Sequence, residues 1–236
     1  DKAYKIPAAK QAVKKEWDKL DGIGAWDFSS VTEKWKVKKR LKDAKKIGHF
    51  GTVRALCHKK NAQLPEEFWS YKGRVVFRGD IVKDQDGNWA VFNEQGTSAS
   101  HLMAARFVDA LARFPGMDGE DADASSAYTQ VILGDDCPET WVSLPRDRWP
   151  KSWFNSDGTP KYDEPVIRLI RNLYGHPLAG LYWAQFCDKA VRKGGFEPVV
   201  GWECVYKHPK DGLILSIYVD DFKLGGREDK LAPMWK

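Results

Sequence analysis

Two adjacent carboxylates, Asp220 and Asp221, follow an apolar and aromatic run over residues 213–219 and precede Phe222. This pattern predicts a buried strand that turns sharply at the acids, which places both carboxylates at the tip of a β-hairpin. Adjacent carboxylates repel each other and lose hydration at such a position, and a divalent metal ion compensates both costs. A solvated surface turn is the alternative, because Asp is common in turns.

The backbone direction decides whether both acids can reach one ion. Neighbouring residues on a regular strand point to opposite faces, but the pleat breaks at a tight turn, where the two carboxylates can approach each other. We therefore expect Asp220 to be the main metal ligand and Asp221 to assist it.

A second group of acids, Glu120, Asp121 and Asp123, lies upstream in the chain. On most surfaces such a group forms a solvated loop. The small residues after Asp123 leave room beside its carboxylate, and a short apolar helical segment is predicted to begin at Ala127-Tyr128.

The net charge of +5 is unevenly distributed, since residues 1–60 carry seventeen Lys and Arg against seven Asp and Glu. This asymmetry suits a protein that holds a polyanion with one part and metal ions with another, although a solvated Lys-rich helix explains the charge equally well. No apolar run approaches about 20 residues and no signal peptide opens the chain, so no membrane association is expected. The four cysteines are far apart without a C-x-x-C pair, which argues against a zinc site and fits a reducing compartment.

Periodicity and turn residues predict a mixed set of elements. The predicted helices are residues 7–20, 100–114, about 181–193 and a start after 228; the predicted strands are 50–56, 71–78, 140–144, 165–170 and 202–208; loops are predicted over 80–96 and 145–165. Residues 31–49 fit either one basic helix or an exposed strand followed by a helix. In the helix over 100–114, an apolar stripe is predicted to pack under a sheet; it consists of Leu102, Ala105, Phe107, Val108 and Leu111.

The strands over 50–56 and 71–78 are predicted to form an antiparallel hairpin. Lys72, Arg74 and Arg78 alternate along its second strand and would share one face. Such a face can present cations to a triphosphate or a template backbone, or can be an ordinary solubilising surface.

The string Tyr-Val-Asp-Asp at 218–221 resembles the catalytic hairpin of reverse transcriptases, and the upstream segments resemble the copia-type retrotransposon branch of that family. The resemblance covers about residues 8–230 and follows the family's motif order. Its motifs are a fingers string at 72–79, Asp123-x-x-x-Ala127-Tyr128, Leu173-Tyr174-Gly175 with Ala179 and Trp183, and the hairpin acids.

The resemblance implies an α+β fold with a reverse-transcriptase palm, in which helices back an antiparallel sheet, and a fingers subdomain. Residues 1–98 would be the basic fingers-like part and 99–236 the palm, with the thumb and RNase H domains absent. The implied function is RNA-directed DNA polymerisation by two-metal transfer of a nucleotide to a primer 3′-hydroxyl. RNA template, DNA primer, deoxynucleoside triphosphates and the remaining Pol segments are the implied partners, in a cytoplasmic retrotransposon particle or the nucleus.

The resemblance also implies roles for individual residues. Asp123, Asp220 and Asp221 would be catalytic and would hold two Mg²⁺ ions, with Mn²⁺ as an alternative. The implied nucleotide-binding residues are Lys72, Arg74, Tyr128 and Leu178. Tyr128 would exclude a ribose 2′-hydroxyl by its volume, whereas Leu178 stands where the family has a Gln and cannot replace its hydrogen bonds.

Two further interpretations compete with an active polymerase. A catalytically inactive retrotransposon-derived remnant would bind nucleic acid without incorporating nucleotides. A nucleotide cyclase is disfavoured because no Gly-Gly-acid turn of that family is present. The polymerase interpretation predicts carboxylate oxygens of Asp123 and Asp220 within about 4 to 6 Å of each other, because both must contact a shared pair of ions. Asp121, which does not fit the motif, should point away.

Overall fold

The computed structural model describes residues 5–92, 99–135 and 137–235. The chain forms two compact units, the first made of Asp1–Phe92 with Ile132–Pro177 and the second of Asn93–Val131 with Leu178–Lys236. Each unit has its own five-stranded sheet, so the chain mixes α and β structure as expected. The division into fingers-like and palm parts at residue 98 stays a prediction, and that boundary falls outside the described residues.

The sheet of the first unit combines parallel and antiparallel pairs. Its strands, in spatial order, are β1 (Trp26–Glu33), β6 (Pro165–Leu169), β5 (Glu139–Ser143), β2 (Gly48–Lys60) and β3 (Ser70–Phe77). β2 pairs with β5 in parallel, and the other neighbours are antiparallel. The predicted hairpin of β2 and β3 is therefore confirmed.

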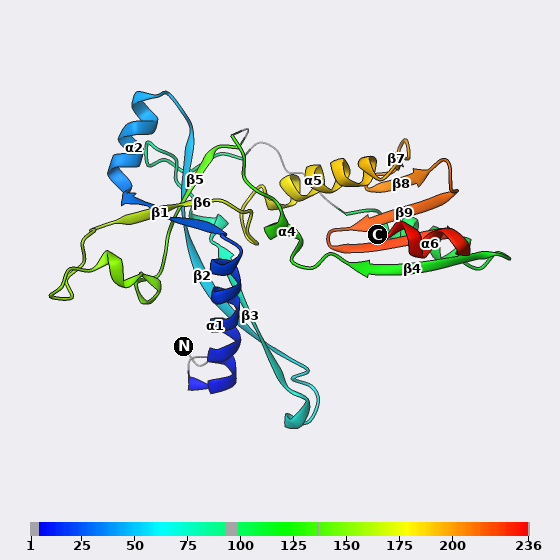
Figure 1. Ribbon diagram of the computed structural model, residues 1–236, viewed down its shortest axis with the longest axis horizontal. Helices are drawn as coiled ribbons and strands as arrows, with labels where there is room; N and C mark the ends of the chain where they lie inside the picture. The colour runs from blue at the N-terminus through cyan, green and yellow to red at the C-terminus, as the bar shows by residue number, and fades with distance from the viewer. Residues whose placement is uncertain (1–4, 93–98, 136, 236) are drawn as a thin grey trace. The chain divides into compact units, whose positions relative to one another are not determined.

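Helix α1 (Pro7–Gly22) lies along this hairpin (Figure 1). Its buried residues recur every three or four positions and are Ala9, Val13, Trp17 and Leu20. Gly73 of β3 permits the close approach, because a Cβ there would lie 2.4 Å from the carbonyl oxygen of Ala12. The predicted N-terminal helix is confirmed, and it covers the face of β3 that carries Gly73.

The basic segment after β1 resolves the alternatives for residues 31–49. β1 ends at Glu33 and helix α2 (Lys34–Asp43) follows, so the strand-then-helix alternative is correct. Val37 and Leu41 of α2 are buried in a cluster with Phe50. Because these apolar residues face the core, most of the Lys side chains of α2 lie outward.

The connecting segments of the first unit contain short turns of helix. The segment predicted as a loop over 145–165 holds η4 (Arg146–Arg148) and η5 (Lys151–Trp153), with Trp153 buried. The loop predicted over 80–96 begins within η3 (Gly79–Ile81), and residues 93–96 of it lie outside the described residues.

The sheet of the second unit is antiparallel throughout. Its strands, in spatial order, are β4 (Met117–Asp123), β10 (Asp221–Arg227), β9 (Leu213–Tyr218), β8 (Val205–His208) and β7 (Glu197–Pro198). Asp221 pairs with Asp123 on one side and Tyr218 on the other. This register brings the acids of two distant sequence motifs to one end of the sheet.

Helix α5 (Ala179–Lys193) covers one face of this sheet. Its buried residues form a stripe with a spacing of four residues: Ala179, Trp183, Cys187 and Val191. The last three join Leu215, Ile217 and Leu224 in one apolar cluster. The helix ends at Lys193 with Gly194 as its C-cap, which agrees with the predicted end at about residue 193. The short helices α4 (Ala127–Gln130) and α6 (Glu228–Met234) complete the unit.

Helix α3 (Leu102–Leu111) lies on the opposite face, which carries Gly119 and Gly225. A Cβ on Gly225 would lie 2.6 Å from Cγ1 of Val108, so the close contact requires glycine. The predicted apolar stripe is wrong in part, because Leu102 and Phe107 are 62% and 55% exposed whereas Val108 is buried. The reason is that the glycine-lined surface accepts small side chains of the helix. No helix in the described part of the chain is long and apolar enough to span a membrane.

Candidate active site

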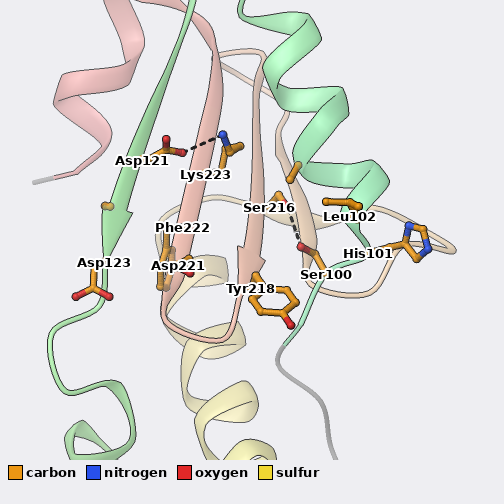
Figure 2. A pocket seen from close by; sticks show the side chains of 12 residues that line it. Ser100, His101, Leu102, Asp121, Asp123, Ser216, Tyr218, Asp221, Phe222 and Lys223 are labelled. Carbon is orange, nitrogen blue, oxygen red and sulfur yellow. Dashed lines mark hydrogen bonds and ion pairs between the residues drawn. The ribbon is translucent and has the colours of Figure 1, made fainter. Parts of the chain in front are cut away.

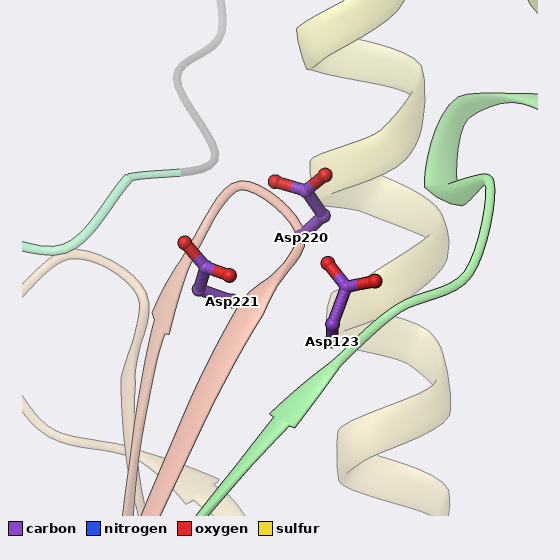
Figure 3. A group of neighbouring side chains, drawn as sticks. All are labelled: Asp123, Asp220 and Asp221. Carbon is purple, nitrogen blue, oxygen red and sulfur yellow. The ribbon is translucent and has the colours of Figure 1, made fainter. Parts of the chain in front are cut away.

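Three carboxylates meet where the second sheet ends in its hairpin turn. Asp123 ends β4, Asp220 lies in the turn and Asp221 begins β10. One carboxylate oxygen from each lies within 4.8 Å of the other two, and Figure 3 shows the three side chains around a common space. The expected approach of Asp123 and Asp220 is therefore confirmed, while their catalytic and metal-binding roles stay predictions.

The turn that carries Asp220 has a strained backbone. Val219 and Asp220 are the two residues between β9 and β10, and Val219 has φ 59° whereas Asp220 has no positive φ. This is the pattern of a type II′ turn, whose first central position favours glycine. A β-branched residue there costs about 1 to 3 kcal/mol, so surrounding contacts must hold the turn.

Two hydrogen bonds hold the two carbonyl groups of this turn. The indole Nε1–H of Trp183 donates to the carbonyl oxygen of Val219 at 2.5 Å. The backbone N–H of Ala124 donates to the carbonyl oxygen of Asp220 at 2.7 Å. The turn is thus fixed from α5 on one side and from the end of β4 on the other. Sequence reasoning matched Trp183 only as part of a motif and missed this contact.

Within the described part of the chain, no ion pair balances the charges of the three acids. Asp123 and Asp221 are exposed and Asp220 is half-buried. Among the described residues, no Lys or Arg forms an ion pair with any of the three. Two carboxylates at this separation repel each other by about 1 kcal/mol even in a water-like dielectric. Because all the available ligand atoms are carboxylate oxygens, the residues fit Mg²⁺ or Mn²⁺ rather than a softer metal.

Asp121 lies on the same strand as Asp123 but belongs to a separate ion-pair network. Its carboxylate is 3.2 Å from the ammonium of Lys223 (Figure 2). The same ammonium lies 2.6 Å from the carboxylate of Asp109. The hydrogen bond to Asp109 and then the one to Asp121 raise the pKa of Lys223. Asp121 is thus paired with Lys223 and is not one of the three clustered carboxylates, but it lines the same cavity as Asp123 and Asp221, so the expectation that it points away is not confirmed.

A cavity of about 790 Å³ adjoins the carboxylates on the sheet face that carries Asp123 and Asp221. It lies between the N-terminal end of α3 and the ends of β9 and β10 (Figure 2). Ser100 and Ser216 share a buried hydrogen bond of 2.8 Å in its wall, and Tyr218 lines it with 58% of its surface exposed. Asp123 and Asp221 therefore open onto a space large enough for a small ligand.

Tyr128 and Leu178 also lie in the second unit. Tyr128 is half-buried against the apolar cluster under the sheet. Burial and the negative charge of Asp220 raise the pKa of its phenol, so the ring stays neutral beside the acids. Leu178 is half-buried directly before α5, and its carbonyl oxygen accepts a hydrogen bond from the N–H of Tyr182. Its side chain has no polar atom to offer a nucleotide.

Lys72 and Arg74 lie in the first unit on β3, on the face opposite Gly73 and α1. Both are exposed, and the guanidinium of Arg74 lies 4.8 Å from the ring centre of Tyr174. They share one face as predicted. Including Arg78 on this strand was wrong, because β3 ends one residue earlier and Arg78 forms an ion pair with Asp80 at 2.9 Å.

Comparison with known proteins gives a weak but extended similarity. No protein-family model matches the chain. The chain is 24% identical over 219 residues, 92% of its length, to the transposon Ty1-DR5 and Ty1-DR1 Gag-Pol polyproteins of Saccharomyces cerevisiae. The same identity and span are found with the truncated transposon Ty1-A Gag-Pol polyprotein of that yeast, of which the match covers 15%. The chain spans about a tenth of the Ty1-DR5 and Ty1-DR1 polyproteins. This similarity supports a protein derived from a retrotransposon polyprotein.

Proposed function

We propose that this chain is the RNA-directed DNA polymerase part of a copia-type Pol polyprotein and extends a DNA primer on an RNA template. The observation that carries the proposal is the convergence of three carboxylate oxygens within 4.8 Å on a Tyr-Val-Asp-Asp hairpin. The unbalanced charge of these acids and the similarity to Gag-Pol polyproteins support it.

In this proposal Asp123, Asp220 and Asp221 hold two Mg²⁺ ions. Such ions, when bound, lower the pKa of a primer 3′-hydroxyl and neutralise charge on the triphosphate and the pyrophosphate leaving group. The strained turn and the register of β4 and β10 hold the three carboxylates in place for these ions. Because the carboxylates are already close together, little reorganisation is needed when the ions and substrate bind.

Other residues would choose and orient the nucleotide. The half-buried ring of Tyr128 would occupy the space that a ribose 2′-hydroxyl needs, which favours deoxynucleotides. The exposed cations Lys72 and Arg74 would contact the triphosphate or the template backbone. RNA template, DNA primer, deoxynucleoside triphosphates and further Pol segments are the proposed partners, inside a retrotransposon particle in the cytoplasm or in the nucleus.

Primer extension tests this proposal directly. An oligo(dT) primer on poly(A) is incubated with Mg²⁺, labelled dTTP and the purified chain. The parent should extend the primer, and Asp123→Asn should reduce incorporation on the order of a hundredfold or more, because the reacting groups lose their alignment. Asp121→Asn is the matched control, since its carboxylate belongs to the Lys223 network. Equal extension by Asp123→Asn and the parent would contradict the proposal.

The identity of Leu178 favours a second candidate, an inactive nucleic-acid-binding remnant. An apolar side chain there cannot supply the polar nucleotide contact of the family. The remnant would bind template-primer in a salt-dependent way but add no nucleotide. Leu178→Gln distinguishes the candidates. Nucleotide incorporation by this variant but not by the parent would show that the parent lacks activity because one polar side chain is missing.

A further inference from the structure

The indole of Trp183 connects α5 to the turn of Val219 and Asp220 between β9 and β10. Trp183 is 2% exposed, and its ring packs against Phe186 with centroids 5.8 Å apart, so its position on α5 is fixed. From there Nε1–H donates to the carbonyl oxygen of Val219, the residue directly before Asp220. The contact therefore joins the main helix of the second unit to the backbone that carries a candidate metal ligand.

The backbone of Val219 makes this contact necessary. A β-branched residue with φ 59° is unfavourable, and an unrestrained turn would relax toward another conformation. Such relaxation would rotate the peptide that follows and move the carboxylate of Asp220 away from Asp123. The second restraint, from the Ala124 N–H to the carbonyl oxygen of Asp220, acts on the peptide after Asp220 and not on the peptide between Val219 and Asp220.

We propose that Trp183 is a positioning residue of the carboxylate cluster: its indole N–H holds the strained turn at Val219 and thereby sets Asp220 against Asp123 for a divalent cation. This inference rests on the proposed function only in its choice of cation. Trp183 touches neither the cation nor substrate, and it acts through the Val219 carbonyl.

Mn²⁺ alone is the probe, and its binding to the full chain is measured from the free-ion signal in electron paramagnetic resonance. Trp183→Phe keeps an aromatic ring but removes the donor, and it should weaken Mn²⁺ binding by about tenfold. Replacement of Trp183 by the analogue β-(3-benzothienyl)alanine, in which sulfur takes the place of the indole N–H at nearly unchanged shape, should weaken binding equally. Val191→Ala, a core truncation further along α5, is the control and should lower stability without changing Mn²⁺ binding.

A double-mutant cycle with Val219→Gly separates positioning from packing. Glycine adopts this φ without strain, so the turn no longer depends on the indole. In the Val219→Gly background, Trp183→Phe should weaken Mn²⁺ binding by less than about threefold. An equal decrease in both backgrounds, or parent-like Mn²⁺ binding by the benzothienyl variant, would overturn the inference.

The same titration distinguishes this inference from the proposed function. If the parent binds Mn²⁺ no better than Asp123→Asn does, the carboxylates do not form a metal site and both ideas fail. If the parent binds through Asp123 and the Trp183 variants bind as tightly, only the role of Trp183 fails.

Discussion

Replacing Asp220 by Asn should stabilise the protein in the absence of divalent ions and remove most of the stabilisation that Mn²⁺ provides. Asp220 faces two other carboxylates within 4.8 Å, and each pair costs about 1 kcal/mol in a water-like dielectric. Removing its charge should therefore raise the free energy of unfolding by about 2 kcal/mol at low ionic strength, which corresponds to an increase in Tm of about 4 to 8 °C. In the parent, Mn²⁺ at a hundred times its Kd should add about 2.7 kcal/mol.

Thermal unfolding of the parent and Asp220→Asn, each in EDTA and in Mn²⁺, measures both effects. Asp220→Asn should have the higher Tm in EDTA, and the parent should have the higher Tm in Mn²⁺. Asp121→Asn is the control, because Asp121 pairs with Lys223 and its replacement should change stability by at most about 1 kcal/mol and leave the Mn²⁺ response intact. If Asp220→Asn has the same Tm as the parent in EDTA, and Mn²⁺ raises both Tm values equally, the three carboxylates do not act as one site.

Three other outcomes follow from the remaining residues. Tyr128→Ala should let an active enzyme use ribonucleotides while retaining deoxynucleotides, and an unchanged preference in competition assays would show that the ring only fills space. Neutralising Lys72 or Arg74 should raise the apparent KM for nucleotide, or should lower the slope of log binding constant against log salt concentration for the template. The slope should fall by about one for each phosphate contact that is lost. An unchanged KM together with an unchanged slope would contradict a role in phosphate binding. The hydrogen bond from Arg40 holds the pKa of Glu139 at about 2, below its ordinary 4.5, so Glu139 stabilises the first unit at neutral pH and this contribution disappears as the pH falls from about 4.5 to about 2. Glu139→Gln should lower the free energy of unfolding by about 1 to 2 kcal/mol at pH 7, allowing for solvent screening. It should also reduce the loss of stability between about pH 4.5 and pH 2. An acid-denaturation curve identical to that of the parent would contradict the ion pair.

The amino-acid sequence by itself determined the elements whose signals are local. The period of the apolar residues predicted α1, the pair Gly194-Gly195 predicted the end of α5, and the alternation of cations predicted the shared face of Lys72 and Arg74. The apolar run that ends in Asp220-Asp221 predicted the hairpin and its acids. In these segments each residue's neighbours along the chain carry the pattern, so no knowledge of distant contacts was needed.

Only the tertiary structure decided the elements that depend on distant partners. β4 (Met117–Asp123) contains four acids and has low strand propensity, yet it is a strand because β10 pairs with it. The face that α3 buries is set by the glycines on the sheet beneath it rather than by its own apolar stripe. The hydrogen bond from Trp183 to Val219 joins residues 36 positions apart. A hydrogen bond or a pairing register between remote segments produces no periodic pattern in either segment. The sequence therefore identified the acidic residues, while the sheet and α5 determined how their carboxylates come together.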